Sequence, residues 1–219
     1  MPFETREIKE RLLADNEKAA AGVRKTLSDS GIFFVNIMAS PGAGKTTLLE
    51  KTIKALKGSY RIGVMEADAD GDVDAARLSE YGIKVLQVHT GGLCHMDADM
   101  TERALSHLPL EELDLVFLEN VGNLVCPAEF DVGASLSVCL LSIPEGDDKP
   151  LKYPLMFTVA DAVLISKTDV WPAFDFDAEL FQERVHALNP ACVIMPLSAE
   201  KEEGLEEWLS FLKERIKAK

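Results

Sequence analysis

Short apolar runs recur along the chain, at intervals that leave room for a helix between one run and the next. Runs of this kind, without regular polar alternation, are typical of strands buried on both faces of a parallel sheet. We expect strands over residues 33–38, 61–65, 84–88, 115–118, 136–141, 162–165 and 192–197.

The stretches between these runs have helical periodicity. Residues 5–28 place Ile8, Leu12, Val23 and Leu27 at helical spacing, and Gly31 is a plausible stop. Further helices are expected over 47–56, 72–79, 97–107, 176–188 and 204–216. This alternation predicts an α/β fold with a single doubly covered, mostly parallel sheet of the P-loop NTPase type. We expect a single domain over 1–219 with an N-terminal helix at about 4–30 that packs outside the sheet.

A glycine-containing loop joins the first predicted strand to the next helix. Its residues Ala39-Ser40-Pro41-Gly42-Ala43-Gly44-Lys45-Thr46 match the phosphate-binding loop G-x-x-x-x-G-K-[ST], except that Ala39 replaces the first glycine. Backbone N–H groups and the helix N-terminus then bind phosphate, Lys45 reaches the β- and γ-phosphates, and Thr46 binds Mg²⁺. The nucleotide-binding residues expected here are Pro41, Gly42, Ala43, Gly44, Lys45, Thr46 and Thr47. The alternative is a turn with a chance lysine.

Carboxylates follow the second and fourth predicted strands. Residues 66–74 contain five of them, and Asp68 is the expected Mg²⁺ ligand, ahead of Asp72 and Asp74. Glu119 ends the fourth strand, where P-loop NTPases carry a carboxylate that supports Mg²⁺. The alternatives are a solvated acidic turn and an ordinary strand end. We expect Lys45, Asp68 and Glu119 to be catalytic, with Mg²⁺ held by Thr46, Asp68 and Glu119.

Gly122 follows Glu119 by three residues, so its N–H is placed to meet the γ-phosphate. The sixth strand ends in Ser166-Lys167-Thr168-Asp169, which is similar to the guanine-reading N-K-x-D sequence of GTPases with Ser166 in place of Asn. Asp169 accepts from the guanine N1–H and amino group, and Lys167 covers the ring. Ser198 and Ala199 belong to a second base-contacting element, in which Glu200 replaces Lys.

Metal-ligating side chains follow the third and fourth predicted strands, which we expect to be neighbours. Cys94 and His95 lie in a glycine-flanked loop, and Cys126 follows Glu119 by seven residues. Two thiolates and an imidazole suit Zn²⁺ or Ni²⁺, and a second chain or a water would complete the site. The alternative is that the Cys-His pair is incidental. Segment 119–126 would couple the γ-phosphate sensor to the metal.

The remaining cysteines and histidines are not expected to bind metal: Cys139, Cys192 and His89 are interpreted as structural, and His107 and His186 as solvated. Cys139 and Cys192 lie inside apolar runs, and His89, His107 and His186 lie at a strand end or on helices. The formal net charge of −14 argues against a nucleic-acid partner. The sequence has no apolar signal run and no membrane-span candidate, so a cytoplasmic protein is expected.

The chain resembles the HypB-type nickel-incorporation GTPases that mature [NiFe] hydrogenase. The resemblance covers nearly the whole chain and rests most specifically on Glu119-Asn120-Val121-Gly122-Asn123-Leu124-Val125-Cys126-Pro127. It implies a SIMIBI-like G domain, GTP hydrolysis with Mg²⁺ coupled to Ni²⁺ delivery, and a homodimer whose interface carries a Ni²⁺ or Zn²⁺ site of Cys94, His95 and Cys126. The implied partners are a HypA-type metallochaperone and the hydrogenase large-subunit precursor.

Some positions depart from the family pattern: Ala39, Ser166 and Glu200 in the nucleotide motifs, and Asp99 where a second His is frequent. Three other functions stay open. One is a urease-accessory-type nickel GTPase, although its Cys-Pro-His motif is absent. Another is a P-loop ATPase or kinase with relaxed base specificity, which Asp169 disfavours. The last is a zinc-stabilised scaffold with negligible turnover.

Overall fold

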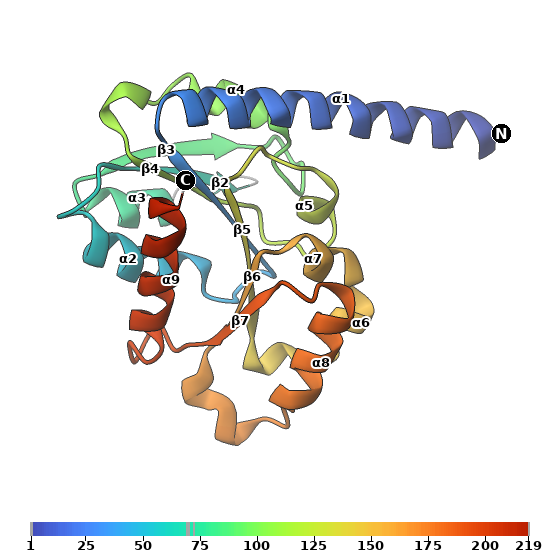
Figure 1. Ribbon diagram of the computed structural model, residues 1–219, viewed down its shortest axis with the longest axis vertical. Coiled ribbons are helices and arrows are strands. Elements are labelled where there is room, and N and C mark those ends of the chain that lie inside the picture. The colour runs from blue at the N-terminus through green and yellow to red at the C-terminus, as the bar shows by residue number, and fades with distance from the viewer. Residues whose placement is uncertain (1, 69–70, 72, 219) are drawn as a thin grey trace.

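Residues 2–68, 71 and 73–218 are described in a computed structural model of the chain (Figure 1). Within these residues, seven strands form one sheet in the order β3-β2-β4-β1-β5-β6-β7, and every neighbouring pair is parallel. The strands are β1 Phe33–Ala39, β2 Ile62–Asp68, β3 Lys84–His89, β4 Leu115–Glu119, β5 Leu136–Ser142, β6 Ala162–Ser166 and β7 Val193–Pro196. The predicted α/β fold class is therefore confirmed.

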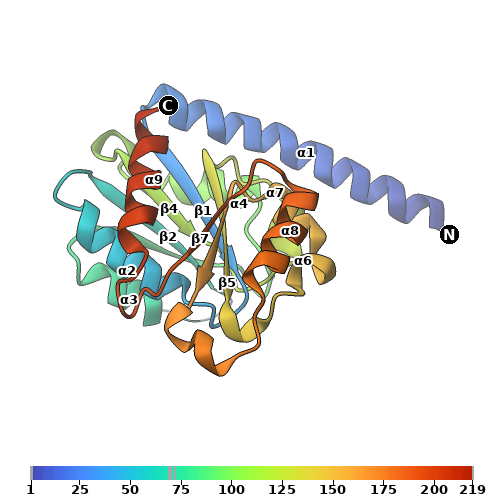
Figure 2. The ribbon, with the colours of Figure 1, turned by 60° about the horizontal axis from the view of Figure 1, so that its bottom comes forward.

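Helices cover both faces of the sheet, as the uninterrupted burial of β1 and β4 requires (Figure 2). The α-helices are α1 Pro2–Asp29, α2 Lys45–Leu56, α3 Val73–Ser79, α4 Ala98–Leu105, α5 Cys126–Glu129, α6 Lys149–Lys152, α7 Pro154–Val159, α8 Ala178–Leu188 and α9 Leu205–Lys217. Short 3₁₀ turns occupy Leu110–Glu112, Ile143–Glu145 and Thr168–Ala173.

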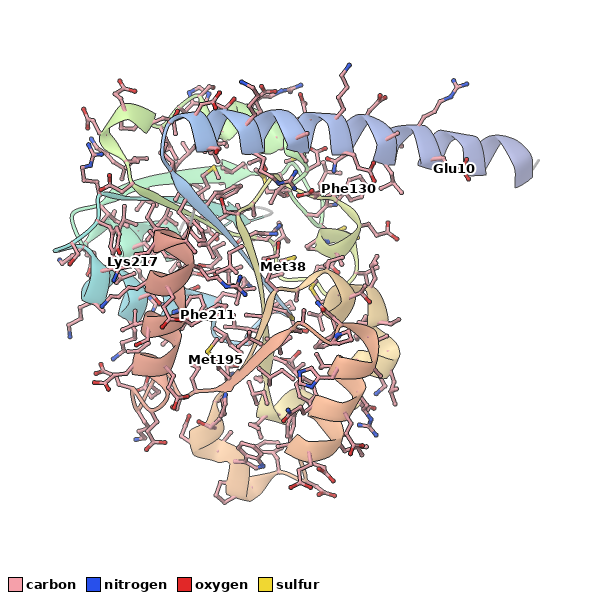
Figure 3. The ribbon with its side chains drawn as sticks, in the orientation of Figure 1. Glu10, Met38, Phe130, Met195, Phe211 and Lys217 are labelled. Carbon is pink, nitrogen blue, oxygen red and sulfur yellow. The ribbon has the colours of Figure 1, made fainter. Side chains whose placement is uncertain are left out.

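Alternate residues of β1 pack into the core on opposite faces of the sheet. Val35 and Ile37 pack with α2 and α9, where Trp208 is fully buried and donates from Nε1 to Thr52 at 3.0 Å. Phe34 packs on the opposite face with α1 and α4, and Met38, labelled in Figure 3, packs there with α7 and α8. This two-sided burial keeps the carboxyl ends of the strands in a rigid position.

The second half of the N-terminal helix packs against the body of the fold. Val23 and Leu27 are buried against the sheet and α4, whereas Leu12 is 58% exposed. The first turns of α1 project beyond the body of the fold (Figures 1 and 2). Among the described side chains of the predicted apolar stripe, Val23 and Leu27 are buried and Leu12 is not; the side chain of Ile8 lies outside the described part.

The structure differs from the sequence prediction in short elements, in one strand position and in the end of β2. This strand was expected to end at residue 65 but runs to Asp68, so Glu66 lies inside it. The helices α5, α6 and α7 and the 3₁₀ turns were not predicted, because segments of three to six residues have too little periodicity to register. The expected neighbours β3 and β4 are separated by β2, so that prediction was wrong. Among the helices of the described chain, none is both long enough and apolar enough for a membrane crossing.

Candidate functional site

The loop after β1 lines a cavity of about 520 Å³ at the carboxyl edge of the sheet, together with the ends of β2 and β4. Gly42 and Gly44 have φ angles of 75° and 103°, which side chains with a Cβ rarely adopt. Ala39 is the last residue of β1 and keeps strand geometry, so this position needs no glycine. Lys45 and Thr46 begin α2, whose N-terminus faces the cavity.

Glu119 is held inside this cavity, next to the phosphate loop. Its Oε1 accepts a hydrogen bond from Thr46 Oγ1 at 2.8 Å, while its buried Oε2 has no hydrogen-bond partner. Burial raises the pKa of Glu119 to about 7, and Lys45 and Thr46 oppose that rise. An orphaned carboxylate oxygen beside a hydroxyl is the donor set that Mg²⁺ prefers, so the residues fit this ion.

Glu66 is a cavity residue that was not singled out from the sequence. It is the register partner of Glu119 and is 4% exposed, and its Oε2 is also without a hydrogen-bond partner. Burial, with further contributions from Glu119, Asp68 and Asp74, raises the pKa of Glu66 to about 7. Its place in the acidic segment directly after the predicted strand 61–65 was the available signal, but its pairing with Glu119 depends on strand order.

The rest of the acidic segment is partly described. Asp68, which ends β2, and Asp74 both line the cavity. Asp72 lies outside the described residues. Arg77, another residue not singled out, also lines the cavity and pairs with Asp74 at 3.2 Å and with Glu50 at 2.9 Å. The structure therefore adds one cation to the expected lysines.

Gly122 lies directly against the phosphate loop. A Cβ atom at this position would stand 3.0 Å from both the backbone nitrogen and Cγ of Pro41. Asn123 N donates to Ala39 O at 2.8 Å, which fixes the same segment to the end of β1. The segment after β4 therefore touches the loop at the position predicted for a γ-phosphate sensor.

A second cavity, of about 230 Å³, lies beside the first and shares Gly44, Thr47 and Lys167 with it. Its other lining residues include Ala43, Ser166, Asp169, Ser198, Ala199 and Glu200. The structure thus brings the two predicted base-contacting elements together beside the phosphate loop.

Hydrogen bonds hold this second cavity in shape. Ser166 Oγ donates to the backbone oxygen of Ala43 at 2.7 Å, so serine supplies a tie between this segment and the phosphate loop. Ser198 Oγ donates to Asp169 Oδ1 at 2.5 Å and orients that carboxylate. Ser198 is fully buried and Asp169 is exposed, so the serine holds the carboxylate at the rim of the cavity.

The three predicted metal ligands also meet. Ligand atoms of Cys94, His95 and Cys126 all lie within 4.8 Å of one another, and the two sulfurs are 2.8 Å apart. The His95 ring stacks on Phe130, labelled in Figure 3, with centroids 4.1 Å apart. Burial lowers the pKa of His95, which favours the neutral imidazole that binds metal. The residues therefore fit a borderline-soft ion.

These ligands meet although the strands that precede them are not neighbours, contrary to the expectation. Because β2 separates β3 from β4, the loop after β3 must pass the carboxyl end of β2 to reach Cys126. Asp97 ends this loop as the N-cap of α4, and its Oδ1 accepts from Met100 N at 2.8 Å. Asp99 pairs with Arg103 at 2.5 Å and is not part of the thiol-imidazole cluster.

The remaining cysteines are core residues, as expected. Cys139 and Cys192 are buried, and burial raises the pKa of both thiols, that of Cys192 to about 11. His186 Nε2 lies 3.1 Å from the backbone oxygen of Cys192, which is a structural contact.

Known proteins are similar to this chain in sequence and in fold. The sequence profile of the family described as CobW/HypB/UreG, nucleotide-binding domain, matches residues 33–196. The hydrogenase maturation factor HypB of Azotobacter chroococcum mcd 1 is 44% identical over 206 residues, which are 94% of this chain and 68% of that protein.

Two solved structures are similar over nearly the full length. HypB from Helicobacter pylori in complex with nickel has a TM-score of 0.88 and 39% identity, covering 93% of this chain and 96% of that one. The hydrogenase maturation factor HypB from Archaeoglobus fulgidus has a TM-score of 0.86 and 37% identity, covering 93% and 99%. These matches favour neither the urease-accessory nor the ATPase or kinase alternative.

Proposed function

The chain belongs to the HypB family of hydrogenase maturation factors, and we propose that it is a GTP-hydrolysing metallochaperone that helps insert nickel into [NiFe] hydrogenase. The proposal includes a cytoplasmic location. The observation that carries it is the position of Glu119 and Cys126: one short segment leaves the phosphate cavity and ends in the thiol-imidazole cluster.

The phosphate cavity carries out GTP hydrolysis in this proposal. Lys45 neutralises charge on the β- and γ-phosphates, and the N–H groups of residues 41–47 direct their dipoles at the same oxygens. Thr46, Asp68 and Glu119 hold Mg²⁺, which when bound neutralises charge on the phosphate oxygens. Ionised Glu119 is favoured once that cation is present, because its orphaned oxygen then has a partner.

Guanine is read in the second cavity. Asp169, oriented by Ser198, accepts hydrogen bonds from the N1–H and amino groups of the base. Lys167 lies at the junction of the two cavities, where its stem covers the ring. Adenine offers no matching pair of donors, so the Asp169 carboxylate would gain no hydrogen bonds from that base.

The cluster of Cys94, His95 and Cys126 binds the metal cargo, Ni²⁺ or Zn²⁺. Three ligands leave a tetrahedral ion incomplete, so a second copy of the chain supplies further ligands in a homodimer. Leu93 and Val125, beside the two cysteines, are each 50% exposed and give this face apolar surface for that contact. The chain then exchanges this ion with its partners, a HypA-type metallochaperone and the hydrogenase large-subunit precursor.

The test is a Ni²⁺ and Zn²⁺ titration of GDP-bound and GTP-analogue-bound protein, with molecular mass measured in parallel. The proposal requires that metal affinity or mass depend on nucleotide state and that Cys126→Ser remove this dependence. Cys192→Ser serves as the matched control, because Cys192 lies in the core outside the cluster. Weak metal binding that is identical in all states would reduce the chain to a GTPase without a chaperone role.

A further inference from the structure

Asn120, which directly follows β4, has a fully buried side chain that connects three distant segments. Its Oδ1 accepts from the backbone nitrogen of Met96 at 3.1 Å and from that of Val121 at 2.9 Å. Its Nδ2 donates to Asn36 Oδ1 on β1 at 3.2 Å. Both backbone partners are obligatory donors, so the amide orientation is determined by its surroundings.

Asn120 lies between the nucleotide cavity and the metal cluster. On one side, its chain neighbour Glu119 is bonded to Thr46 of the phosphate loop. On the other side, Met96 directly follows His95 of the metal cluster, and its own side chain is fully buried. A hydrogen bond therefore bypasses the covalent route through residues 121–125 and reaches the other half of the metal cluster.

The loop between β3 and α4, which carries Cys94 and His95, is also held by hydrogen bonds from the helix α1. Asn16 Oδ1 accepts from Ala98 N at 2.9 Å, and its Nδ2 donates to Asp131 O at 2.9 Å. Neither Ala98 nor Asp131 lines the nucleotide cavity. The loop that carries Cys94 and His95 is thus held by one asparagine from the nucleotide side and by another from a helix outside it.

We propose that Asn120 is the positioning residue that transmits nucleotide state to Cys94 and His95. This inference rests on the proposed function, since it needs a nucleotide-dependent metal site. When the end of β4 moves as Glu119 engages or releases Mg²⁺, the Asn120 oxygen moves with it. The Met96 N–H follows, because a buried donor left unpaired is costly. His95 shifts with its neighbour, while Asn16 holds the far end of the loop in place.

The test compares metal affinity in the two nucleotide states for matched asparagine variants. Zn²⁺ dissociation constants, measured by competition with a chromophoric chelator, are taken for GDP-bound and GTP-analogue-bound protein. In wild type the two constants should differ by roughly 5- to 150-fold, the usual range for coupled sites. In Asn120→Ala the ratio should fall to within about twofold of one. In Asn16→Ala both constants should weaken by a similar factor, leaving the ratio unchanged.

A conservative variant and a measurement on unaltered protein separate positioning from folding. Asn120→Asp retains the acceptor, and Asn36 can rotate its amide to donate to it, so this variant should keep the wild-type ratio. In wild type, exchanging GDP for the GTP analogue without metal should change the amide resonance of Met96. An unchanged Met96 resonance, or a wild-type ratio in Asn120→Ala, overturns the inference alone. A wild-type ratio of one overturns the nucleotide-coupled function as well.

Discussion

The buried carboxylate pair makes stability depend on pH in a way that Glu66→Gln should reveal. Glu66 is 4% exposed and faces Glu119 in register, and burial is the first cause that raises its pKa from 4.5 to about 7. The amide introduced by the substitution is nearly isosteric and carries no charge at any pH. It also offers a donor to Gln87 Oε1, which is buried without a hydrogen-bond partner.

The sign follows from comparing the folded and unfolded chains. The unfolded chain loses the Glu66 proton near pH 4.5, whereas the folded, ligand-free protein keeps it until about pH 7. The contribution of Glu66 to the stability of the fold is therefore fully present below pH 4.5 and is lost as the pH rises through its folded-state pKa of about 7. The difference of about 2.5 pKa units corresponds to at most ~3 kcal/mol. The substitution should remove this loss, so its stabilising effect should grow from near zero at low pH to about 3 kcal/mol above neutrality.

Urea denaturation of both proteins between about pH 5 and 8 measures this difference, because the effects of titrating groups that do not interact with Glu66 cancel. Glu80→Gln, at an exposed position on the protein surface, is the matched control and should show no growing difference. Adding Mg²⁺ and GTP should reduce the benefit, since cations favour the ionised carboxylate. A pH-independent difference, or a variant less stable than wild type near pH 8, would refute the reasoning.

Further predictions concern the nucleotide and metal sites. Lys45→Ala should lower GTP turnover by about 10²- to 10³-fold or more, measured by phosphate release, because the transition-state charge loses its partner. Asp169→Asn should reduce the preference for GTP over ATP by roughly 10- to 100-fold in competition assays, because a charge-assisted acceptor is lost. Cys126→Ser should weaken Zn²⁺ binding by more than the roughly 10- to 100-fold typical of outer-shell changes, with the circular dichroism spectrum unchanged.

The outcomes that would contradict these expectations are specific to each variant. Retained turnover in Lys45→Ala would remove the phosphate-loop assignment. Unchanged base preference in Asp169→Asn would mean that guanine is recognised elsewhere. An unfolded Cys126→Ser would make that cysteine structural, and its partial exposure argues against such a result.

Local pattern was enough to predict most of the fold and the position of the motifs. The strand β1 and the helix α2 were expected from an apolar run, a Gly-Lys-Thr junction and helical periodicity, all within a few residues. The helix α4 was expected from its periodicity, and Asp97 caps it through a local hydrogen bond. The short helices α5 to α7 were missed because single turns depend on their neighbours.

Sequence alone determined the α/β class, the phosphate loop and the residue types that can bind a nucleotide and a soft metal, since these depend on periodicity and spacing along the chain. Only the tertiary structure decided which distant residues meet. The order β3-β2-β4-β1 pairs Glu66 with Glu119 and sends the loop after β3 back to Cys126. The bond between Asn120 and Met96 follows from that path. Strand order is set by the packing of the whole sheet, and no local pattern encodes it.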